Sequence, residues 1–397
     1  MKPMNAGKLI DLYKRDLFEK VMPFWMNNAI DYEYGGYMTW LDRDGGIICT
    51  DKPVWMQGRG VWTFSRLFNE FGKDNRYLEA ADQGYRFLKD YCMDKDGRMF
   101  FRMTRDGKPV MKRRYVFSDV FAAAGCAEYY RATKDEEALE LAKKSFGTVY
   151  NAFNIPGSIP SKYQGEMMSM KAHSPSMIVI DLCKTMRSVD CTYDYTGIIE
   201  DSCRLITESF YKPELGCLLE NIGPKNEYMR HIPEGRCVNP GHAIESAWFI
   251  LEEAMEQKNM KLQKAALGIL DDSLEMGWDR EFGGLFYFVD SEGKPPYALE
   301  WDMKLWWPHN EALYALLLAY YATGNQKYND WYERIHEWSF ARFNDDEYGE
   351  WYGYLHRDGS LASSVKGSLW KGPFHVPRFY LKGIQVLEKI KSASTNG

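Results

Sequence analysis

The chain has 397 residues, of which 45% are hydrophobic and 27% charged, and its formal net charge is −6. This acidic balance argues against binding to a nucleic-acid backbone. The sequence has no run of 18 or more apolar residues, and charges interrupt the apolar positions of its first 20 residues. We therefore expect neither a membrane span nor a signal peptide. Eight cysteines without a C-x-x-C pair favour reduced thiols in a cytoplasmic protein.

A glycine turn followed by short alternating aromatic or apolar residues recurs along the chain. Glycine accepts the positive φ of such turns, and the alternation predicts a short β-hairpin. The copies lie about 60 residues apart, which indicates a repeat architecture. The third copy is the weakest. The turns are centred on Gly35, Gly97, Gly157, Gly216, Gly283 and Gly349.

Helical patterns occur in pairs between these turns. In several pairs the first helix is apolar all round and the second has a charged stripe, so the first is buried and the second faces solvent. Inner and outer helices of this kind predict an all-α (α/α)6 barrel, a toroid of six helical hairpins forming a single domain over residues 1–397. An open solenoid is the alternative. The predicted helices are 61–72 and 77–92, 120–133 and 137–153, 176–189 and 198–211, 243–256 and 262–278, 311–324 and 329–343, and a closing helix at 376–390.

Three of the seven histidines stand at the starts of predicted inner helices. His242 lies in "NPGHAIE", His309 in "LWWPHNEA" and His375 in "FHVPR". Each has a proline close by, and proline is accepted in the first turn of a helix. The N-termini of inner helices surround one mouth of a toroid, so we expect the three histidines to converge there.

The other four histidines are less informative. His173 also begins an inner helix, and we expect it to cap or pack. His336 and His356 are placed on an outer helix and a surface hairpin, and no role is assigned to His231.

These phrases, together with "QGRGVWTFSRL" at 57–67, occur in the order of their counterparts in a known family. Over nearly its whole length the chain resembles the N-acylglucosamine 2-epimerase family. The resemblance implies an (α/α)6 fold and a sugar 2-epimerase that interconverts N-acetylglucosamine and N-acetylmannosamine. It also implies a homodimer, no cofactor for the chemistry, and ATP as an allosteric activator in some members.

Epimerisation at C2 of a ring-opened sugar needs a base on one face of the carbon and an acid on the other. Histidine titrates near neutrality and suits both tasks. The resemblance assigns them to His242 and His375. Glu245 lies three residues after His242 on the same helical face, so we expect it to accept a ring N–H of that histidine. The resemblance makes Glu311 a carboxylate that steadies the histidine site.

Five further residues are predicted to bind substrate. Arg59 would stabilise the enediolate, or else form a buried ion pair with a glutamate. Trp307 and Trp370 offer aromatic faces to a sugar ring, whereas Trp306 is expected in the core. His309 would contact a substrate hydroxyl, and Arg378 would position a substrate oxygen or anchor a carboxylate.

Several alternatives remain open at this point. A cellobiose 2-epimerase or a mannose-type aldose–ketose isomerase would share the fold. A glycoside hydrolase would need two opposed carboxylates, and a non-catalytic carbohydrate- or protein-binding toroid would need none. No P-loop and no histidine or cysteine cluster typical of zinc is present, so we expect no metal. The acidic candidates for a hydrolase are Asp119, Glu166, Asp181, Glu300 and Asp302.

Overall fold

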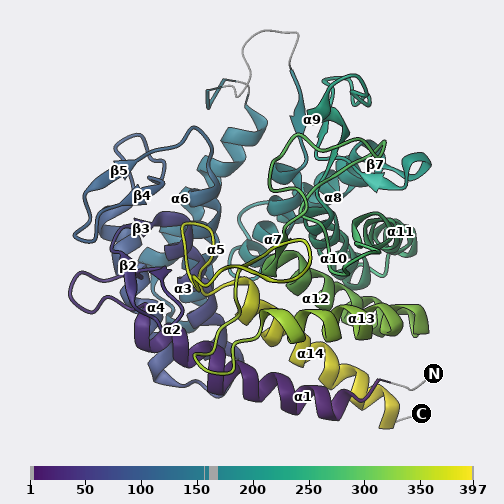
Figure 1. Cartoon of the computed structure of the whole chain (residues 1–397). Coiled ribbons are helices and arrows are strands. Elements are labelled where there is room, and N and C mark those ends of the chain that lie inside the picture. The colour runs from purple at the N-terminus through teal and green to yellow at the C-terminus, as the bar shows by residue number, and fades with distance from the viewer. Residues whose placement is uncertain (1–3, 156, 161–168, 396–397) are drawn as a thin grey trace.

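The computed structural model describes residues 4–155, 157–160 and 169–395. Six helices form an inner ring in which each contacts the next, and the last contacts the first (Figure 1). This arrangement confirms the predicted (α/α)6 toroid. The inner helices are α3 (Val54–Glu70), α5 (Phe117–Thr133), α7 (Ser174–Arg187), α10 (Pro240–Glu256), α12 (Trp306–Thr323) and α14 (His375–Thr395).

An outer helix packs against each of the first five inner helices. The outer helices begin at Asp or Asn residues whose side chains accept a backbone N–H of the first turn, which is a favourable cap. They are α4 (Asn75–Tyr91), α6 (Glu136–Asn154), α8 (Tyr195–Leu205) with its extension η3 (Ile206–Phe210), α11 (Met260–Gly277) and α13 (Gln326–Phe343).

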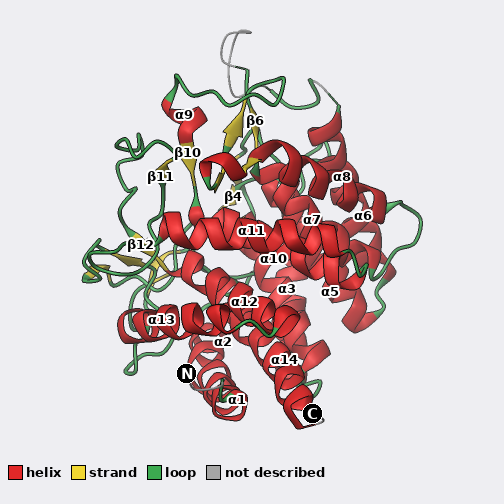
Figure 2. Cartoon of the chain, turned by 90° about the vertical axis from the view of Figure 1, so that its right-hand side faces the viewer, coloured by secondary structure: helices red, strands yellow, loops and turns green. Residues whose placement is uncertain are grey.

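The sixth hairpin is formed by the two ends of the chain. The sequence patterns named five pairs and a closing helix without an outer partner. In the structure that partner is the N-terminal segment, which comprises α1 (Ala6–Arg15), η1 (Asp16–Val21) and α2 (Met22–Asn28). α1 and η1 pack on α14, and α1 lies beside α14 in Figures 1 and 2.

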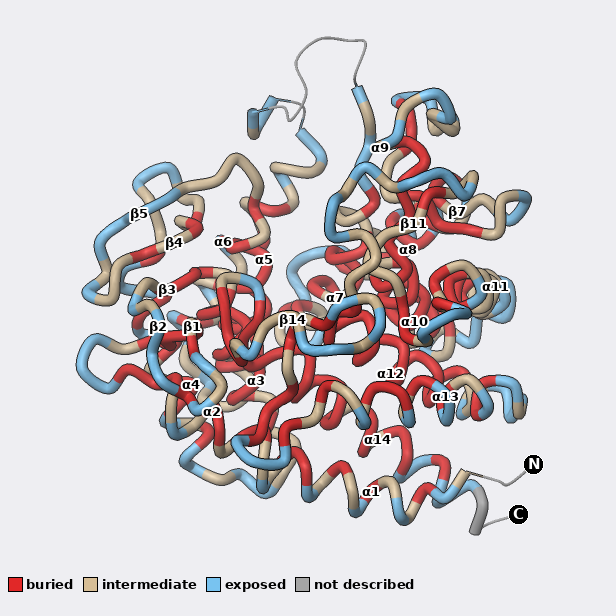
Figure 3. The backbone as a smooth tube through the Cα atoms, viewed as in Figure 1, coloured by how far each residue is buried: buried red, intermediate tan, exposed pale blue. Residues whose placement is uncertain are grey.

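Burial follows the predicted division between inner and outer helices. The inner helix α12 is buried on all sides over its first 14 residues, whereas α13 exposes one face. Figure 3 shows the same contrast as buried backbone in the centre and exposed backbone at the periphery. In the described part of the chain, no helix is both long and apolar enough to cross a membrane.

Short antiparallel strands connect the hairpins on the side where the inner helices begin (Figure 2). β3, β10 and β12 each lead directly into an inner helix and pair with a strand from a later loop, so pairing sets where that helix starts. Within the described residues the strands form six small sheets. They are β1 (Trp40–Leu41) with β2 (Ile47–Cys49); β3 (Lys52–Pro53), β4 (Arg102–Met103) and β5 (Pro109–Met111); β6 (Lys171–Ala172) with β9 (Asn221–Ile222); β7 (Tyr211–Lys212) with β8 (Cys217–Leu218); β10 (Cys237–Val238) with β11 (Val289–Asp290); and β12 (Lys304–Leu305), β13 (Tyr354–Leu355) and β14 (Leu361–Ser363). Two short helices, η4 (Pro213–Leu215) and α9 (Pro233–Arg236), complete the connections.

The glycine turns are confirmed at all six predicted positions, since each central glycine has a positive φ. The segment after the third turn includes residues 161–168, which lie outside the described part of the chain. Three of the turns carry an aspartate that binds a fully buried lysine, and each aspartate also binds an arginine. These triads are Asp31–Lys52–Arg105, Asp279–Lys304–Arg357 and Asp345–Lys366–Arg43.

Two glycines bring α3 and α5 into backbone contact. A Cβ on Gly58 would lie 2.4 Å from the carbonyl oxygen of Phe121, and one on Gly125 would lie 2.5 Å from that of Gly58. Neither position can therefore carry a side chain without separating the helices. This contact fixes the first turns of α3, where Arg59 is located.

Candidate active site

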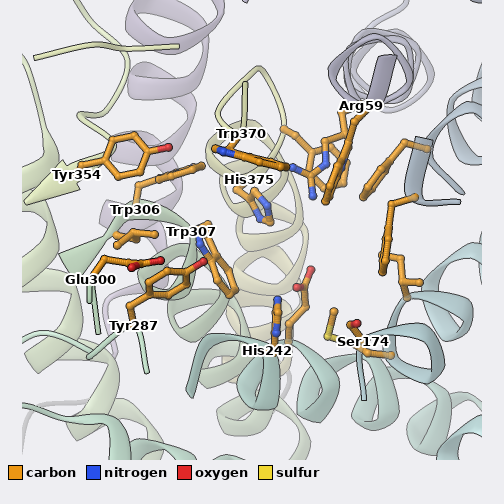
Figure 4. Close-up of a pocket in the computed structure, with 18 of the residues that line it drawn as sticks. Arg59, Ser174, His242, Tyr287, Glu300, Trp306, Trp307, Tyr354, Trp370 and His375 are labelled. Atoms are coloured by element: carbon orange, nitrogen blue, oxygen red, sulfur yellow. The ribbon is translucent and has the colours of Figure 1, made fainter. Parts of the chain in front are cut away.

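A pocket with a cavity volume of about 490 Å³ opens where the inner helices begin (Figure 4). All six inner helices, or the residue just before them, contribute to its wall, which confirms the predicted mouth of the toroid. Most of the wall is aromatic or aliphatic, with few polar groups, as is usual for a small-molecule site. Apart from three tyrosines and the tryptophans, the polar residues in this wall are Arg59, Ser174, His242, Glu245, Glu300 and His375.

His242 lies in the first turn of α10, where the side chain of Asn239 caps its backbone N–H. Its Nδ1 is 3.1 Å from both carboxylate oxygens of Glu220. The prediction that Glu245 accepts this N–H is wrong. Although the two residues share a helical face, the Glu245 carboxylate binds Arg378 instead. Burial lowers the pKa of His242, but the nearby Glu220 charge outweighs it and the net shift is upward.

His375 begins α14 and faces the same pocket. Its Nδ1 is 2.7 Å from Oε1 of Glu311, which agrees with the expected supporting role of that carboxylate. Glu311 also accepts hydrogen bonds from Arg378 at 2.7 Å and from Trp248 at 2.8 Å. Burial, followed by the positive charges of Arg59 and Arg378, holds the pKa of His375 well below its usual value.

Arg378 anchors carboxylates. Its Nη2 donates to both Glu245 and Glu311, and the side chain is almost fully buried. Burial lowers the pKa of Arg378, but these two carboxylates raise it more, so the group stays charged. Glu245, Glu311 and His375 place three potential metal ligands within 4.8 Å of one another. The guanidinium that bridges the two carboxylates supplies the positive charge in this cluster.

Arg59 contributes a cation to the pocket wall. Its guanidinium carbon lies 4.2 Å from the ring centre of Phe121 and 4.6 Å from that of Phe374. Its Nε has no hydrogen-bond partner, and no carboxylate of the described residues forms an ion pair with it. The alternative of a buried Arg–Glu pair is therefore not what the structure shows. Burial, then Arg378, lowers the pKa of Arg59 to about 9, so it is charged at neutral pH.

Trp307 lies between the two pocket histidines. Its ring centre is 5.1 Å from that of His242 and 5.8 Å from that of His375. Figure 4 shows both imidazoles directed toward the cavity, with Trp370 above His375. Trp370 is 41% exposed and lines the pocket, as predicted. Trp306, which was expected to be core, is buried but also forms part of the wall.

His309 does not reach the pocket, so the expectation that it contacts substrate is wrong. Its ring is fully buried and stacks on Trp338 with ring centres 4.9 Å apart. Its Nδ1–H donates to the carbonyl of Leu305, and its Nε2 accepts the N–H of Leu285. Two residues after Trp307, it points to the opposite side of the helix. Burial lowers the pKa of His309 to about 3, so the ring is neutral.

Glu220 was missed by the sequence analysis. Its only signal is a charged residue at the end of the short apolar run that follows Gly216. His173, on the far side of Glu220, stands at the N-cap position of α7, but its side chain makes no capping hydrogen bond. It is fully buried and bonds Ser246, so of the two predicted roles, capping or packing, packing is confirmed. The predicted places of His336 and His356, on α13 and in the β13–β14 hairpin, are also confirmed.

Of the five carboxylates considered for a hydrolase, the four that the structure describes do not form an opposed pair. Glu300 lines the pocket. Asp119 is buried and accepts the N–H of Met99, Asp181 lies 3.9 Å from Arg378, and Asp302 is not part of the wall. Glu166 lies outside the described residues. Glu245, the other carboxylate in the wall, is held by Arg378.

Comparisons with known proteins agree with this arrangement. The family model for N-acylglucosamine 2-epimerase (GlcNAc 2-epimerase) matches residues 36–375. The N-acylglucosamine 2-epimerase of Bos taurus is 36% identical over 396 residues, covering 96% of this chain and 92% of that protein. The cellobiose 2-epimerase of Dictyoglomus turgidum is 26% identical, with 95% and 99% covered.

Solved structures show the same fold. The cellobiose 2-epimerase of Bacillus thermoamylovorans superimposes with a TM-score of 0.84 at 24% identity, covering 96% of this chain and 99% of that one. The match to the family model spans the helix starts that build the pocket, from α3 to His375. The chain therefore belongs to the N-acylglucosamine 2-epimerase family.

Proposed function

We propose that this protein is a sugar 2-epimerase that interconverts N-acetylglucosamine and N-acetylmannosamine. The observation that carries the proposal is the pair of imidazoles, His242 and His375, which come from α10 and α14 and enter one pocket. Each has its Nδ1 bound to a carboxylate, which leaves Nε2 available to a substrate. The choice of an N-acylated sugar is supported by the higher identity to the N-acylglucosamine relatives than to the cellobiose relatives.

The reaction begins with the open-chain sugar, whose aldehyde acidifies the C2–H bond. His375, kept neutral by burial and by the neighbouring arginines, takes this proton on Nε2. The C2–H electron pair moves into an enolate, with a C1–C2 double bond and the negative charge on O1. His242, whose pKa is raised, then donates its Nε2 proton to the opposite face of C2. In the reverse direction the two histidines exchange roles.

Arg59 is placed to stabilise the enolate. It is charged, projects from the wall that also contains His375, and has no carboxylate partner. A fixed cation in a pocket of low polarity acts most strongly on charge that appears in the transition state. Trp307 and Trp370 would support the carbon chain and acyl group by apolar contact.

Proton exchange tests the proposal directly. In D₂O, N-acetylglucosamine should yield N-acetylmannosamine that carries deuterium at C2, observed by NMR. A two-histidine mechanism further predicts that early product contains more deuterium than the recovered substrate. Cleavage of a glycosidic bond without exchange would indicate a hydrolase. Appearance of a ketose would indicate an aldose–ketose isomerase, and exchange in cellobiose but not in N-acetylhexosamines would indicate the disaccharide branch.

Single variants test the two histidines. His242→Asn and His375→Asn should each fold and lose at least about 10²-fold in turnover, the typical contribution of one positioned acid or base. His336→Asn, on the outer helix α13, is the matched control and should keep normal turnover. Near-normal activity in either pocket variant would exclude that histidine as an acid or base.

Four further properties remain predictions of the sequence, three of them from the family resemblance and the location from the cysteine pattern. We propose that the protein is cytoplasmic, forms a homodimer, and needs no cofactor for the chemistry, while ATP acts only as an activator. Light scattering gives the oligomeric state. Adding ATP to the C2-exchange assay separates activation from a requirement.

A further inference from the structure

The two pocket histidines are bound to carboxylates in different electrostatic settings. Glu311, behind His375, also accepts a hydrogen bond from the guanidinium of Arg378, so a fixed cation balances its charge. Glu220, behind His242, has no such partner. In the described part of the chain its ion-pair contacts are with His242 and His173, and with no lysine or arginine.

Glu220 is held firmly between the starts of two inner helices. Its backbone N–H donates to the carbonyl of Cys237 at 2.9 Å, just before α10. Its own carbonyl accepts the N–H of His173 at 2.9 Å, just before α7. β9, which follows it directly, pairs with β6. The side chain is only 14% exposed, so the carboxylate has little solvent to stabilise its charge.

His173 closes the far side of this carboxylate without adding a charge. Its Nε2 lies 2.8 Å from the hydroxyl of Ser246, and its Nδ1 is 3.5 Å from Glu220, without the geometry of a hydrogen bond. Burial lowers the pKa of His173, so this ring is neutral. The neutral ring adds no charge beside the carboxylate that its Nδ1 faces, whichever nitrogen carries the proton. His242 is therefore the neighbour of Glu220 that balances its charge, by taking up a proton.

We propose that Glu220, backed by His173, is the positioning residue that keeps His242 in the proton-donating form, whereas Arg378 neutralises Glu311 and leaves His375 as the base. This inference rests on the proposed epimerase function. Glu220 does not touch the sugar; it acts through the imidazole, holding the Nδ1 proton and directing Nε2 into the cavity. The asymmetry of the two carboxylates thus assigns the acid and the base for the direction in which His375 removes the C2 proton.

Titration of the wild-type enzyme is the first test; it needs no substrate, and variants serve only to assign the resonances. Histidine C–H resonances assigned with His242→Asn and His375→Asn should show His242 titrating above the ordinary value near 6.5 and His375 below it. If His375 titrates above His242, the inference is wrong even when the enzyme epimerises sugars.

Glu220→Gln is the second test. The amide can still accept the Nδ1 proton but carries no charge, so the pKa of His242 should fall by about 1 unit or more. Turnover should fall about 10- to 100-fold with little change in KM, and the alkaline limb of the pH–rate profile should move to lower pH. Glu220→Asp should restore part of the His242 pKa and part of the turnover.

The control is Glu253→Gln. Glu253 lies on α10, the helix that carries His242, and its buried carboxylate binds Arg187 away from the pocket. It should leave the His242 titration unchanged. An unshifted His242 titration in folded Glu220→Gln would overturn the inference. Loss of C2 exchange in the wild type would instead refute the proposed function. If Glu220→Gln does not fold, the wild-type titration decides: a His242 that titrates at or below the ordinary value near 6.5 would also overturn the inference.

Discussion

Replacement of Arg378 by methionine is the most informative test of how the pocket is held together. The guanidinium is almost fully buried and bonds Glu245 and Glu311, so the substitution leaves two buried carboxylates close together without their cation. Breaking a buried ion pair by removing one partner typically costs about 3–5 kcal/mol. We expect a loss of this size in the free energy of unfolding at pH 7, measured by urea denaturation.

The matched control is Arg357→Met. Arg357 also binds a buried carboxylate, that of Asp279, but its side chain is 36% exposed and Asp279 keeps the buried Lys304. Partly exposed ion pairs contribute about 1 kcal/mol or less, so this variant should lose little. Equal m-values in both variants would show that the two unfolding reactions expose the same surface.

Arg378→Met should also change the pH dependence of the reaction in a defined direction. Arg378 helps to hold the pKa of His375 below its usual value, so its removal should raise that pKa and move the acidic limb of the pH–rate profile to higher pH. Arg378→Lys keeps the charge but not the planar fork, and we expect an intermediate effect. An Arg378→Met protein as stable as the Arg357→Met control would refute the buried charge network.

Three other predictions concern separate parts of the molecule. Arg59→Met should lower kcat about 10²- to 10³-fold with a smaller change in KM, because the enolate charge is absent from the bound sugar. Steady-state kinetics tests this, and an effect on KM alone would contradict the role. His309→Asn should lower the melting temperature yet keep kcat per folded molecule, because this ring packs away from the pocket. A loss of kcat without a loss of stability would instead indicate that His309 acts in the active site. Lys304 and Arg357 outweigh the burial of Asp279 and lower its pKa from 3.8 to about 2. Its contribution to stability should therefore be complete above pH 4 and disappear as the pH falls toward 2, and Asp279→Asn should flatten that dependence in urea titrations.

Much of the fold could be predicted because it depends on local sequence patterns. The three- and four-residue spacing of apolar side chains located the helices, and the six glycines located turns that all have a positive φ. Inner helices began several residues earlier than expected, as α3 does at Val54, because pairing of the preceding strands sets their starts. The outer partner of α14 was not named, because the N-terminal segment lies far from it in the sequence.

The site was predicted less completely than the fold. His242, His375, Arg59, Trp307 and Trp370 line one pocket, as the motifs suggested. The predicted partner of His242 and the predicted place of His309 were wrong for the same reason. A spacing along a helix says which residues share a face, but it does not say which of several charged groups from other helices arrives at that face.

The amino-acid sequence was sufficient to define the repeat, the ring of paired helices, the family and the two histidines, because each depends on residues within a turn or two of one another. The pairing of charges became visible only with the folded ring. Glu220 and His242 are 22 residues apart, Glu311 and His375 are 64 apart, and Glu245 and Arg378 are 133 apart. Which carboxylate meets which cation depends on packing between distant helices, and this packing determines which histidine holds the proton.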